Sequence, residues 1–485
     1  MSQKKVVGGF IWRFLERCTS QGVTFIISII LARILGPESY GVVSLVTVFT
    51  SIMQVFVESG LGTSLIQKKE ADDFDFSSVF WFNIGMCLFL YAVMYFVAPL
   101  IANFYQMPEL VAYVRVLSLI LIISGLKNIQ HAYVSRHMKF RVFFYASLSG
   151  TISSGIIAVF MAYRGYGVWA LIAQTLINRL INTMILWIVI KWRPKFVFSW
   201  ARLKGLLSFG WKLLVAKLID TVYNDLRTLL IGKIYDATSL GYYNKGKQFP
   251  HVIVNNVNLS IDSVLFPSLS KAQDSRERLH VMTRRAIKLS TYVMMPITFG
   301  LAACAEPVVR LLLTEQWLPC VTFMRIFCIT YGFYPLATAN LNAIKALGRS
   351  DLFLKLEIWK KVVGVTLLLL TIQISVEAMA YSLLFSTVIS QLINAHPNKS
   401  LLNYSYVEQI KDIFPHFLIS SLMSVLVYGC QFLGLNDWLT LLIQIPLGIT
   451  LYVLFSLLFK IDSFTYIFKV LKNLSKTRKK ERGNG

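Results

Sequence analysis

Three ionisable residues lie within a hydrophobic segment that is long enough to cross a membrane. Residues 8–35 are mostly apolar, yet they include Arg13, Glu16 and Arg17. About 20 apolar residues span the ~30 Å hydrocarbon layer of a bilayer. A charged side chain near its centre costs roughly 2.5–3.5 kcal/mol, so such residues usually face a protein interior or a water-filled cavity. The pattern therefore predicts a transmembrane helix with one hydrated side.

A polar stripe along this segment returns 200 residues later. The first stripe has the three- and four-residue spacing of one helix face, and it consists of Arg13, Arg17, Ser20, Gln21, Thr24 and Ser28. From Arg17 onward, and with Arg33 added, these positions are matched 200 residues later by Lys217, Asp220, Thr221, Asn224, Thr228 and Lys233. The turn at 36–41 is likewise matched by the turn at 236–241. The two copies predict an internal duplication whose halves face one central cavity.

The segments that follow these turns carry a second pair of polar faces. The earlier face consists of Ser44, Thr47, Ser51, Gln54 and Glu58, and the later one of Asn244, Lys247, His251, Asn255, Asn258 and Asp262. Two further segments add Ser124, Asn128, His131 and Ser135, and Thr338, Asn342 and Lys345. Because these residues recur at helical spacing, they predict additional polar walls of the same cavity.

The chemistry of these groups favours an anionic amphiphile that contains a sugar. Desolvated cations attract a phosphate or diphosphate, and amides and hydroxyls suit sugar hydroxyls. The predicted substrate-binding residues are Arg13, Arg17, Gln21, Thr24, Gln54, Lys217, Asn224, Lys247 and Asn255. The candidate residues for coupling to a proton or sodium gradient are Glu58, Asp220, His251 and Asp262. Intramembrane acids and histidines commonly serve as such relays.

Each of these residues also has a structural interpretation, and the sequence leaves both open. Polar side chains between membrane helices often only hydrogen-bond their neighbours. Basic residues near predicted helix ends, such as Arg13, Lys212 and Lys345, can extend to the membrane interface. The acidic residues and His251 can form structural ion pairs or helix-end contacts.

The composition indicates a polytopic membrane protein. The chain has 485 residues, of which 56% are hydrophobic and only 15% charged, with a mean hydropathy of +0.61; soluble domains are about 25% charged. The formal net charge of +24 is distributed over loops, so it does not indicate nucleic-acid binding. The six cysteines lack the paired spacing of disulfide frameworks or metal sites. No cofactor or metal is predicted.

About fourteen apolar runs are long enough to span the membrane. They lie near 8–35, 41–65, 78–104, 112–134, 142–163, 167–190, 205–232, 239–267, 286–313, 320–346, 352–373, 377–395, 413–434 and 438–459. The expected organisation is an N-terminal lobe of six helices at 1–200, a C-terminal lobe at 201–396, two further helices at 397–470 and a basic tail at 471–485. Longer connections are expected at 66–77, 267–285 and 396–412.

Lys and Arg are concentrated in alternate loops, which predicts that the N- and C-termini are both cytoplasmic. The basic set includes 136–141, 191–204 and 271–285, whereas the turns near Pro37 and Thr238 are almost free of such residues.

Four segments at predicted helix ends and turns are distinctive, and they are Leu31-Ala32-Arg33-Ile34-Leu35-Gly36-Pro37-Glu38-Ser39-Tyr40-Gly41, Ser59-Gly60-Leu61-Gly62-Thr63-Ser64-Leu65-Ile66-Gln67-Lys68-Lys69, Leu265-Phe266-Pro267-Ser268-Leu269 and Glu315-Gln316-Trp317. They resemble segments of the polysaccharide transporter family, the lipid-linked oligosaccharide flippases of the multidrug/oligosaccharidyl-lipid/polysaccharide exporter superfamily. The resemblance implies an all-α integral membrane fold with two six-helix lobes around a central cavity, two extra C-terminal helices and alternating access.

The resemblance also implies a function. Members of the family move undecaprenyl-diphosphate-linked sugar units to the periplasmic leaflet of the bacterial inner membrane for O-antigen, capsule or exopolysaccharide assembly. The expected partners are this lipid-linked oligosaccharide, membrane lipids and polysaccharide polymerase machinery. A multidrug exporter is the first alternative, but it predicts twelve helices and an acidic, aromatic pocket. A membrane glycosyltransferase or polymerase is less favoured, because the loops are too short to hold a catalytic site outside the membrane.

Overall fold

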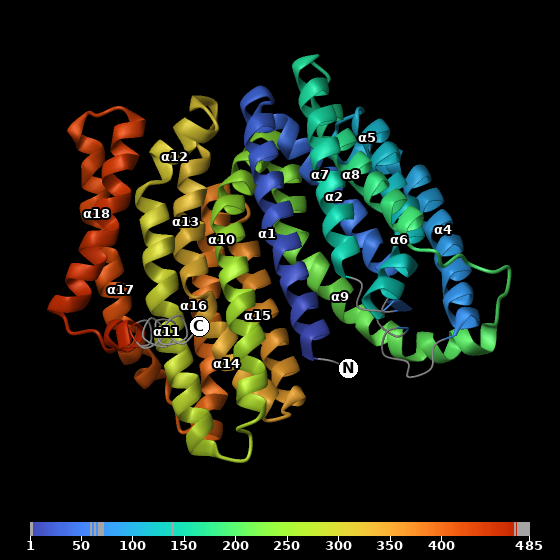
Figure 1. Cartoon of the computed structure of the whole chain (residues 1–485). Coiled ribbons are helices and arrows are strands. Elements are labelled where there is room, and N and C mark those ends of the chain that lie inside the picture. Colours follow the sequence, from blue (N-terminus) through green and yellow to red (C-terminus); the bar gives the residue numbers. More distant parts are fainter. Residues whose placement is uncertain are drawn as a thin grey trace, which may run out of the picture. The chain divides into compact units, whose positions relative to one another are not determined.

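The computed structural model describes residues 3–58, 61, 62, 65, 72–136, 140–469 and 472, and the regular elements in these ranges are helices (Figure 1). Those before residue 241 are α1 (Gln3–Ile34), α2 (Pro37–Glu58), α4 (Asp73–Tyr105), α5 (Leu110–Leu117), α6 (Leu119–Arg136), α7 (Phe140–Tyr163), α8 (Val168–Val189) and α9 (Trp200–Ile234). The chain continues with α10 (Ala237–Ser270), α11 (Arg276–Ala303), α12 (Ala305–Leu312), η1 (Glu315–Trp317), α13 (Cys320–Gly332), α14 (Tyr334–Ala346), α15 (Ser350–Thr371), α16 (Val376–Leu402), α17 (Tyr406–Gly429), η2 (Cys430–Leu433) and α18 (Asp437–Leu458).

Side-chain caps determine where several helices begin. Asp72 accepts a hydrogen bond from the backbone N–H of Asp75, whose carboxylate accepts from the backbone of Asp72 in return. Ser405 and Glu408 form the same reciprocal capping box before α17. These caps satisfy backbone donors that have no partner inside the helix. Helices also extend into the connections expected at 267–285 and 396–412, so the non-helical connections are shorter than expected, at 271–275 and 403–405.

Proline divides two segments that were predicted to be continuous. Pro307 has no N–H to donate to the carbonyl of Ala303, and α11 ends there. The amide of Gln431 donates to this carbonyl at 3.0 Å, so the freed acceptor is satisfied. In 320–346, Pro335 stands in the first turn of α14, and the helix is interrupted at Phe333. The runs at 286–313 and 320–346 are thus each two helices.

The predicted all-α integral membrane fold is confirmed. Within the described ranges, eleven helical segments are long and apolar enough to cross a membrane. Large apolar side chains such as Phe96, Ile188 and Phe432 are 75%, 78% and 79% exposed, as expected for a surface that contacts lipid. α15 is not among the eleven; it carries Lys355, Lys360 and other charged residues. The predicted total of fourteen crossings stays a prediction.

The chain divides into two compact units, residues 1–241 and 242–485. In the first unit, α9 packs against α2 and α4, beside a core shared by α4, α6, α7 and α8. The core of the second unit joins α11, α14, α17 and α18. The lobe boundaries predicted near residues 200 and 396 stay predictions.

The two copies of the repeated turn contact each other reciprocally. A Cβ atom on Gly41 would lie 1.7 Å from the carbonyl oxygen of Ala237, and one on Gly241 would lie 2.1 Å from that of Pro37. Positions 37 and 237, and 41 and 241, are related by the 200-residue offset of the repeat. Such exchange of equivalent residues is typical of a two-fold related contact. It supports the internal duplication, and it requires glycine at both positions.

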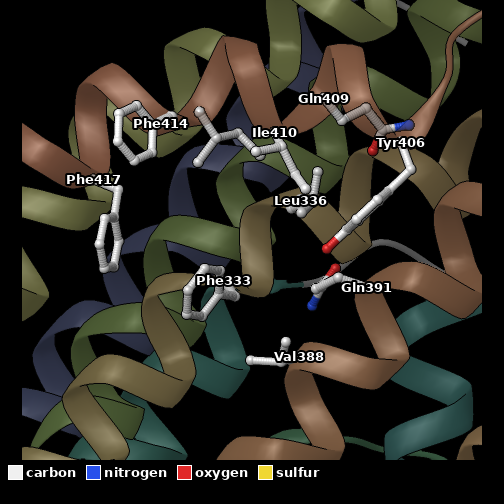
Figure 2. A pocket seen from close by; sticks show the side chains of 10 residues that line it. Phe333, Leu336, Val388, Gln391, Tyr406, Gln409, Ile410, Phe414 and Phe417 are labelled. Carbon is white, nitrogen blue, oxygen red and sulfur yellow. The ribbon is translucent and has the colours of Figure 1, made fainter.

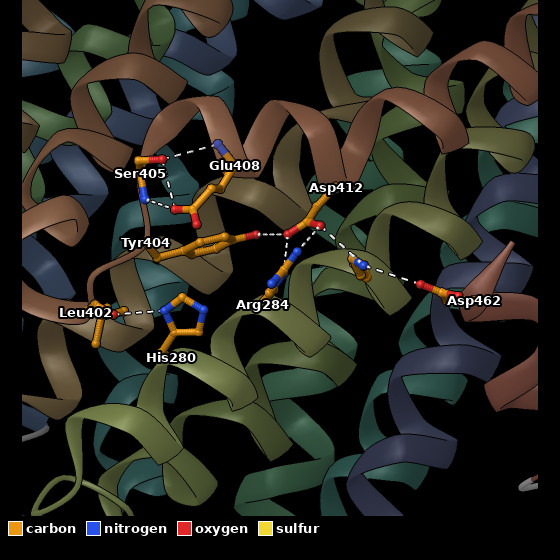
Figure 3. A network of polar contacts seen from close by, with 9 residues as sticks. His280, Arg284, Leu402, Tyr404, Ser405, Glu408, Asp412 and Asp462 are labelled. Atoms are coloured by element: carbon orange, nitrogen blue, oxygen red, sulfur yellow. Dashed lines mark hydrogen bonds and ion pairs between the residues drawn. The ribbon is translucent and has the colours of Figure 1, made fainter.

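A shared carboxylate attaches α17 to α11 in the second unit (Figure 3). The side chain of Asp412 is only 5% exposed, and Arg284 donates to both its oxygens at 2.6 and 2.8 Å. The hydroxyl of Tyr404 donates at 2.8 Å, and the ammonium of Lys288 lies at 3.2 Å. Because each oxygen has a charged partner, the desolvation of the carboxylate is offset by strong hydrogen bonds.

We expect Asp412→Ala to lower the free energy of unfolding by about 2–3 kcal/mol, since it leaves Arg284, Lys288 and Tyr404 without their shared acceptor. Asp462→Ala is the matched control, because Asp462 is 87% exposed and lies 3.7 Å from the same lysine. Its loss should change stability by less than about 0.5 kcal/mol. Thermal unfolding of both purified variants checks this, and equal midpoints would contradict it.

Candidate functional site

A polar pair lies within the mostly apolar interface between α2 and α9. The hydroxyl of Ser51 donates a 2.8 Å hydrogen bond to Oδ2 of Asp225. Further along the interface, the side chain of Leu45 packs where a Cβ on Gly232 would stand. The residue numbers therefore run in opposite directions, and the two helices are antiparallel. This contact places a half-buried carboxylate between α2 and α9 of the first unit.

Arg227 lies two residues further along α9 and is 5% exposed. In the part of the chain that the structure describes, its Nε and Nη2 have no hydrogen-bond partner. Residues two positions apart on a helix do not face each other, so Asp225 is not placed to neutralise it. A buried guanidinium with unused donors is costly. In a membrane helix such a residue is a candidate functional group.

Gln54, a predicted substrate-binding residue, lies in a contact between α2 and α6. Its amide donates to the hydroxyl of Ser124 at 3.0 Å. One turn further along both helices, Asn128 donates to the carbonyl of Val57 at 3.0 Å. These two hydrogen bonds join α2 to α6 within the first unit.

The second unit contains a similar pair of contacts between α10 and α14. The hydroxyl of Thr338 donates to Oδ1 of Asn258 at 2.9 Å, and the amide of Asn342 donates to Oδ1 of Asp262 at 2.7 Å. Both contacts advance by four residues on both helices, so α10 and α14 run in the same direction. Asp262, a predicted ion-coupling residue, thus has a defined hydrogen-bond donor.

The other predicted site residues lie on α1, α2, α9 and α10. Those with exposed side chains are Thr24, Glu58, Lys217, Asp220, Asn224, His251 and Asn255, whereas Gln21 and Lys247 are half-buried. The ring of His251 meets that of Tyr331 edge-on, with centroids 6.0 Å apart. The side chains of Arg13 and Arg17 fall outside the described residues.

Sequence reasoning missed three charged residues, of which Arg227 and Lys245 are buried and Asp225 is half-buried. Arg227 follows the stripe residue Asn224 by three positions, but the repeat aligns it with the apolar Ile27, which concealed it. Asp225 lies outside the stripe. Lys245 of α10 is 2% exposed, with its ammonium 5.7 Å from the centre of the Trp317 ring. An ionisable residue within an apolar run was the available signal for all three.

A cavity of about 220 Å³ opens among α13, α14, α16 and α17 (Figure 2). Gln391, Gln409 and Tyr406 supply its polar groups, and the other lining residues are Phe333, Leu336, Val388, Ile410, Ile413, Phe414 and Phe417. Behind it, Asn340 donates to Gln409 at 2.9 Å. Among the described residues, Oε1 of Gln391 and Nε2 of Gln409 have no hydrogen-bond partner. The lining suits an apolar group with one polar end.

Known membrane transporters share this fold. The solved structure of lipid II flippase MurJ in an inward closed conformation aligns with a TM-score of 0.73 and 19% identity, covering 93% of this chain and 98% of that one. An inward-facing multidrug resistance MATE family transporter of the MOP superfamily gives a TM-score of 0.61 and 14% identity, covering 79% and 94% of the two chains. The fold is therefore that of MOP-superfamily transporters.

Comparisons of the amino-acid sequence identify a family and several relatives. Residues 30–322 match the model of a family described as polysaccharide biosynthesis protein. The succinoglycan biosynthesis transport protein ExoT of Rhizobium meliloti (strain 1021) is 24% identical, covering 72% of this chain and 71% of its own. The teichuronic acid biosynthesis protein TuaB of Bacillus subtilis (strain 168) is 25% identical over 78% and 79%. The lipopolysaccharide biosynthesis protein WzxC of Escherichia coli (strain K12) is 22% identical over 88% of both.

The chain belongs to the polysaccharide biosynthesis protein family, and its fold is that of known membrane transporters. The predicted membership of the polysaccharide transporters is confirmed.

The contact between Ser51 and Asp225 predicts a measurable coupling. Ser51→Ala and Asp225→Asn should each destabilise the protein, and the double variant should lose about 1 kcal/mol less than the sum, because the first change removes the donor and the second the charge of the same hydrogen bond. Ser51→Ala combined with Asp236→Asn is the control, since Asp236 instead accepts a bond from Ser239. The measurement is thermal unfolding of the single and double variants. If the stability losses of Ser51→Ala and Asp225→Asn simply add in the double variant, the contact contributes no stability.

Proposed function

We propose that the chain is a flippase that moves undecaprenyl-diphosphate-linked oligosaccharide units from the cytoplasmic to the periplasmic leaflet of a bacterial inner membrane. The moved units would then enter assembly of O-antigen, capsule or exopolysaccharide, with polymerase machinery as a later partner. The relatives' names concern succinoglycan, teichuronic acid and lipopolysaccharide, which are all surface glycans. The fold similarity to a lipid II flippase supports a lipid-linked cargo.

The observation that carries the proposal is the set of cationic and polar groups on α9. Lys217 and Asn224 are exposed, and Arg227 is buried with unused donors. A diphosphate has several acceptor oxygens with concentrated negative charge, and the planar fork of arginine matches them in pairs. In our proposal Arg227 joins Arg13, Arg17 and Lys217 in holding the diphosphate during transport. Its Nε and Nη2, which have no partner among the described residues, would then gain acceptors from the cargo.

Amides and hydroxyls on α1, α9 and α10 suit the glycan. Asn224 and Asn255 are exposed, and both can donate and accept hydrogen bonds as sugar hydroxyls do. Gln21, Thr24 and Lys247 complete the proposed lining. Gln54 is tied to Ser124 in this conformation, so its contact with cargo would require that bond to exchange. The polyprenyl tail would remain among membrane lipids.

The MATE similarity does not favour a multidrug exporter as the alternative. Both transporter types share the fold, so the fold alone does not separate them. A small lipophilic cation would be repelled by Lys217, Lys247 and Arg227, whereas a diphosphate would be attracted.

Arg227→Met should lower transport by about tenfold or more, since it removes charge-assisted hydrogen bonds but keeps much of the side-chain volume. Arg227→Lys should retain part of the activity. The measurement is the amount of lipid-linked oligosaccharide that accumulates in cells carrying only the variant, by mass spectrometry and normalised to protein abundance. The matched control is Arg115→Met, because Arg115 already donates to the carbonyl of Tyr95. If the well-folded Arg227→Met variant transports as much as the unaltered protein, Arg227 does not bind the cargo.

Coupling to a proton or sodium gradient would use Glu58, Asp220, His251 and Asp262. Asp262→Asn should weaken the gradient dependence of transport in liposomes, because the amide can still accept from Asn342 but no longer carries charge. Asp274→Asn, at an exposed residue between α10 and α11, is the control. If transport by the unaltered protein ignores both gradients, ion coupling is rejected.

A further inference from the structure

A second cavity, of about 350 Å³, lies between the first half of α17 and the C-terminal end of α18. It is formed wholly within the second unit, on the side that loop charges predict to be cytoplasmic. Its lining residues are Lys288, Lys411, Asp412, Phe414, Pro415, His416, Leu418, Ile419, Phe459, Lys460, Ile461, Asp462 and Ser463. It thus combines three lysines with several large apolar side chains.

Most of the polar groups in this cavity already have partners (Figure 3). Asp412 is shared by Arg284, Lys288 and Tyr404. The ring nitrogens of His416 lie 3.1 Å from the hydroxyl of Thr291 and 3.2 Å from that of Ser463. These groups hold the cavity together and have little capacity left for a ligand.

Lys411 and Lys460 differ from the other lining cations. Both are exposed, and no ion pair or hydrogen bond of either ammonium is found within the described residues. The nearby carboxylate of Asp462 is 87% exposed and lies 3.7 Å from Lys288. Arg284 and the three lysines outnumber the two carboxylates, which leaves a local excess of two positive charges. An anion at this position would therefore be attracted.

The backbone at Lys460 supplies an independent observation. Its φ of 48° is left-handed, a conformation in which glycine is strongly preferred. The N–H of Ile461 donates to the carbonyl of Ser456, and that of Lys460 to the carbonyl of Leu457, which together form a Schellman end of α18. A lysine at this strained position is disfavoured for stability. Residues held in such conformations are common at functional sites, and we infer that the charge of Lys460 is used in binding.

Exposed apolar side chains continue from the lysines. Phe414 and Phe459 are each 54% exposed, and Leu418 is 37% exposed. Leu418 follows Phe414 by one helical turn, so the two form an apolar strip along α17. A ligand that fits this surface has a phosphate-like head at the helix ends and hydrocarbon along the helix.

We propose that this cavity binds the headgroup of an anionic glycerophospholipid. Lys411 and Lys460 contact its phosphodiester, and its acyl chains lie along Phe414, Leu418 and Phe459. Basic pockets between membrane helices on the cytoplasmic side bind acidic headgroups in this way. Binding of the lipid would brace the start of α17 against the end of α18. The inference does not depend on which cargo the transporter moves.

The test uses full-length purified protein in detergent, titrated with fluorescent phosphatidylglycerol and, in parallel, with the zwitterionic phosphatidylethanolamine. Each of Lys411→Gln and Lys460→Gly should weaken phosphatidylglycerol binding about fivefold, and the double variant about 25-fold, from the usual contribution of one basic residue near an anionic lipid. Lys271→Gln, on the same predicted side but outside the cavity, should bind normally. Because glycine suits the left-handed position, Lys460→Gly should keep or raise thermal stability, so weaker binding would not reflect misfolding.

Unchanged binding by the double variant would overturn the proposal, as would equal binding of phosphatidylethanolamine. If inorganic phosphate displaces phosphatidylglycerol at comparable concentrations, the cavity is a small-anion site and the lipid assignment fails. These measurements involve no transport, so their outcome is separate from that of the proposed flippase activity.

Discussion

The cost of placing a charge within an apolar membrane helix governs how this protein is arranged. Asp412 is almost fully buried, and it is tolerated because two cations and a tyrosine hydroxyl share it. Asp225 and Asp262 each accept a hydrogen bond from a neighbouring helix. In every case the carboxylate is a cross-link between helices. Asp262, a predicted ion-coupling residue, therefore also holds two helices of its unit together.

Arg227 is the informative exception to this rule. Its side chain is as buried as that of Asp412, yet two of its nitrogens lack partners among the described residues. An unsatisfied buried donor lowers stability, and it persists where function requires it. A transporter that changes conformation must exchange partners at its site, because differential contacts in each state are what shift the equilibrium. Arg227 has the properties expected of such a group.

The repeat gives both units equivalent internal ties. In the first, α2 is bonded to α6 through Gln54 and Asn128; in the second, α10 is bonded to α14 through Asn258 and Asp262. Contacts of this kind favour movement of each unit as one body, as rocking of two repeats requires. Gly41 and Gly241 are equivalent in the same way, because the absence of a side chain at each lets the other copy of the turn approach closely.

The amino-acid sequence by itself determined the membrane class, the approximate helix positions, the repeat and the transporter family. These follow from local properties, namely apolar length, helical period and turn residues, which tertiary packing does not reverse. It did not determine where helices break, because the interruption at Ala303 is stabilised by Gln431, 128 residues away. Nor did it distinguish an exposed polar residue, such as Asn224, from one that is hydrogen-bonded to a neighbouring helix, such as Gln54. Only the tertiary structure decided these, because a side chain's partners depend on which helix packs against it, and that information is not contained in the periodicity of its own helix.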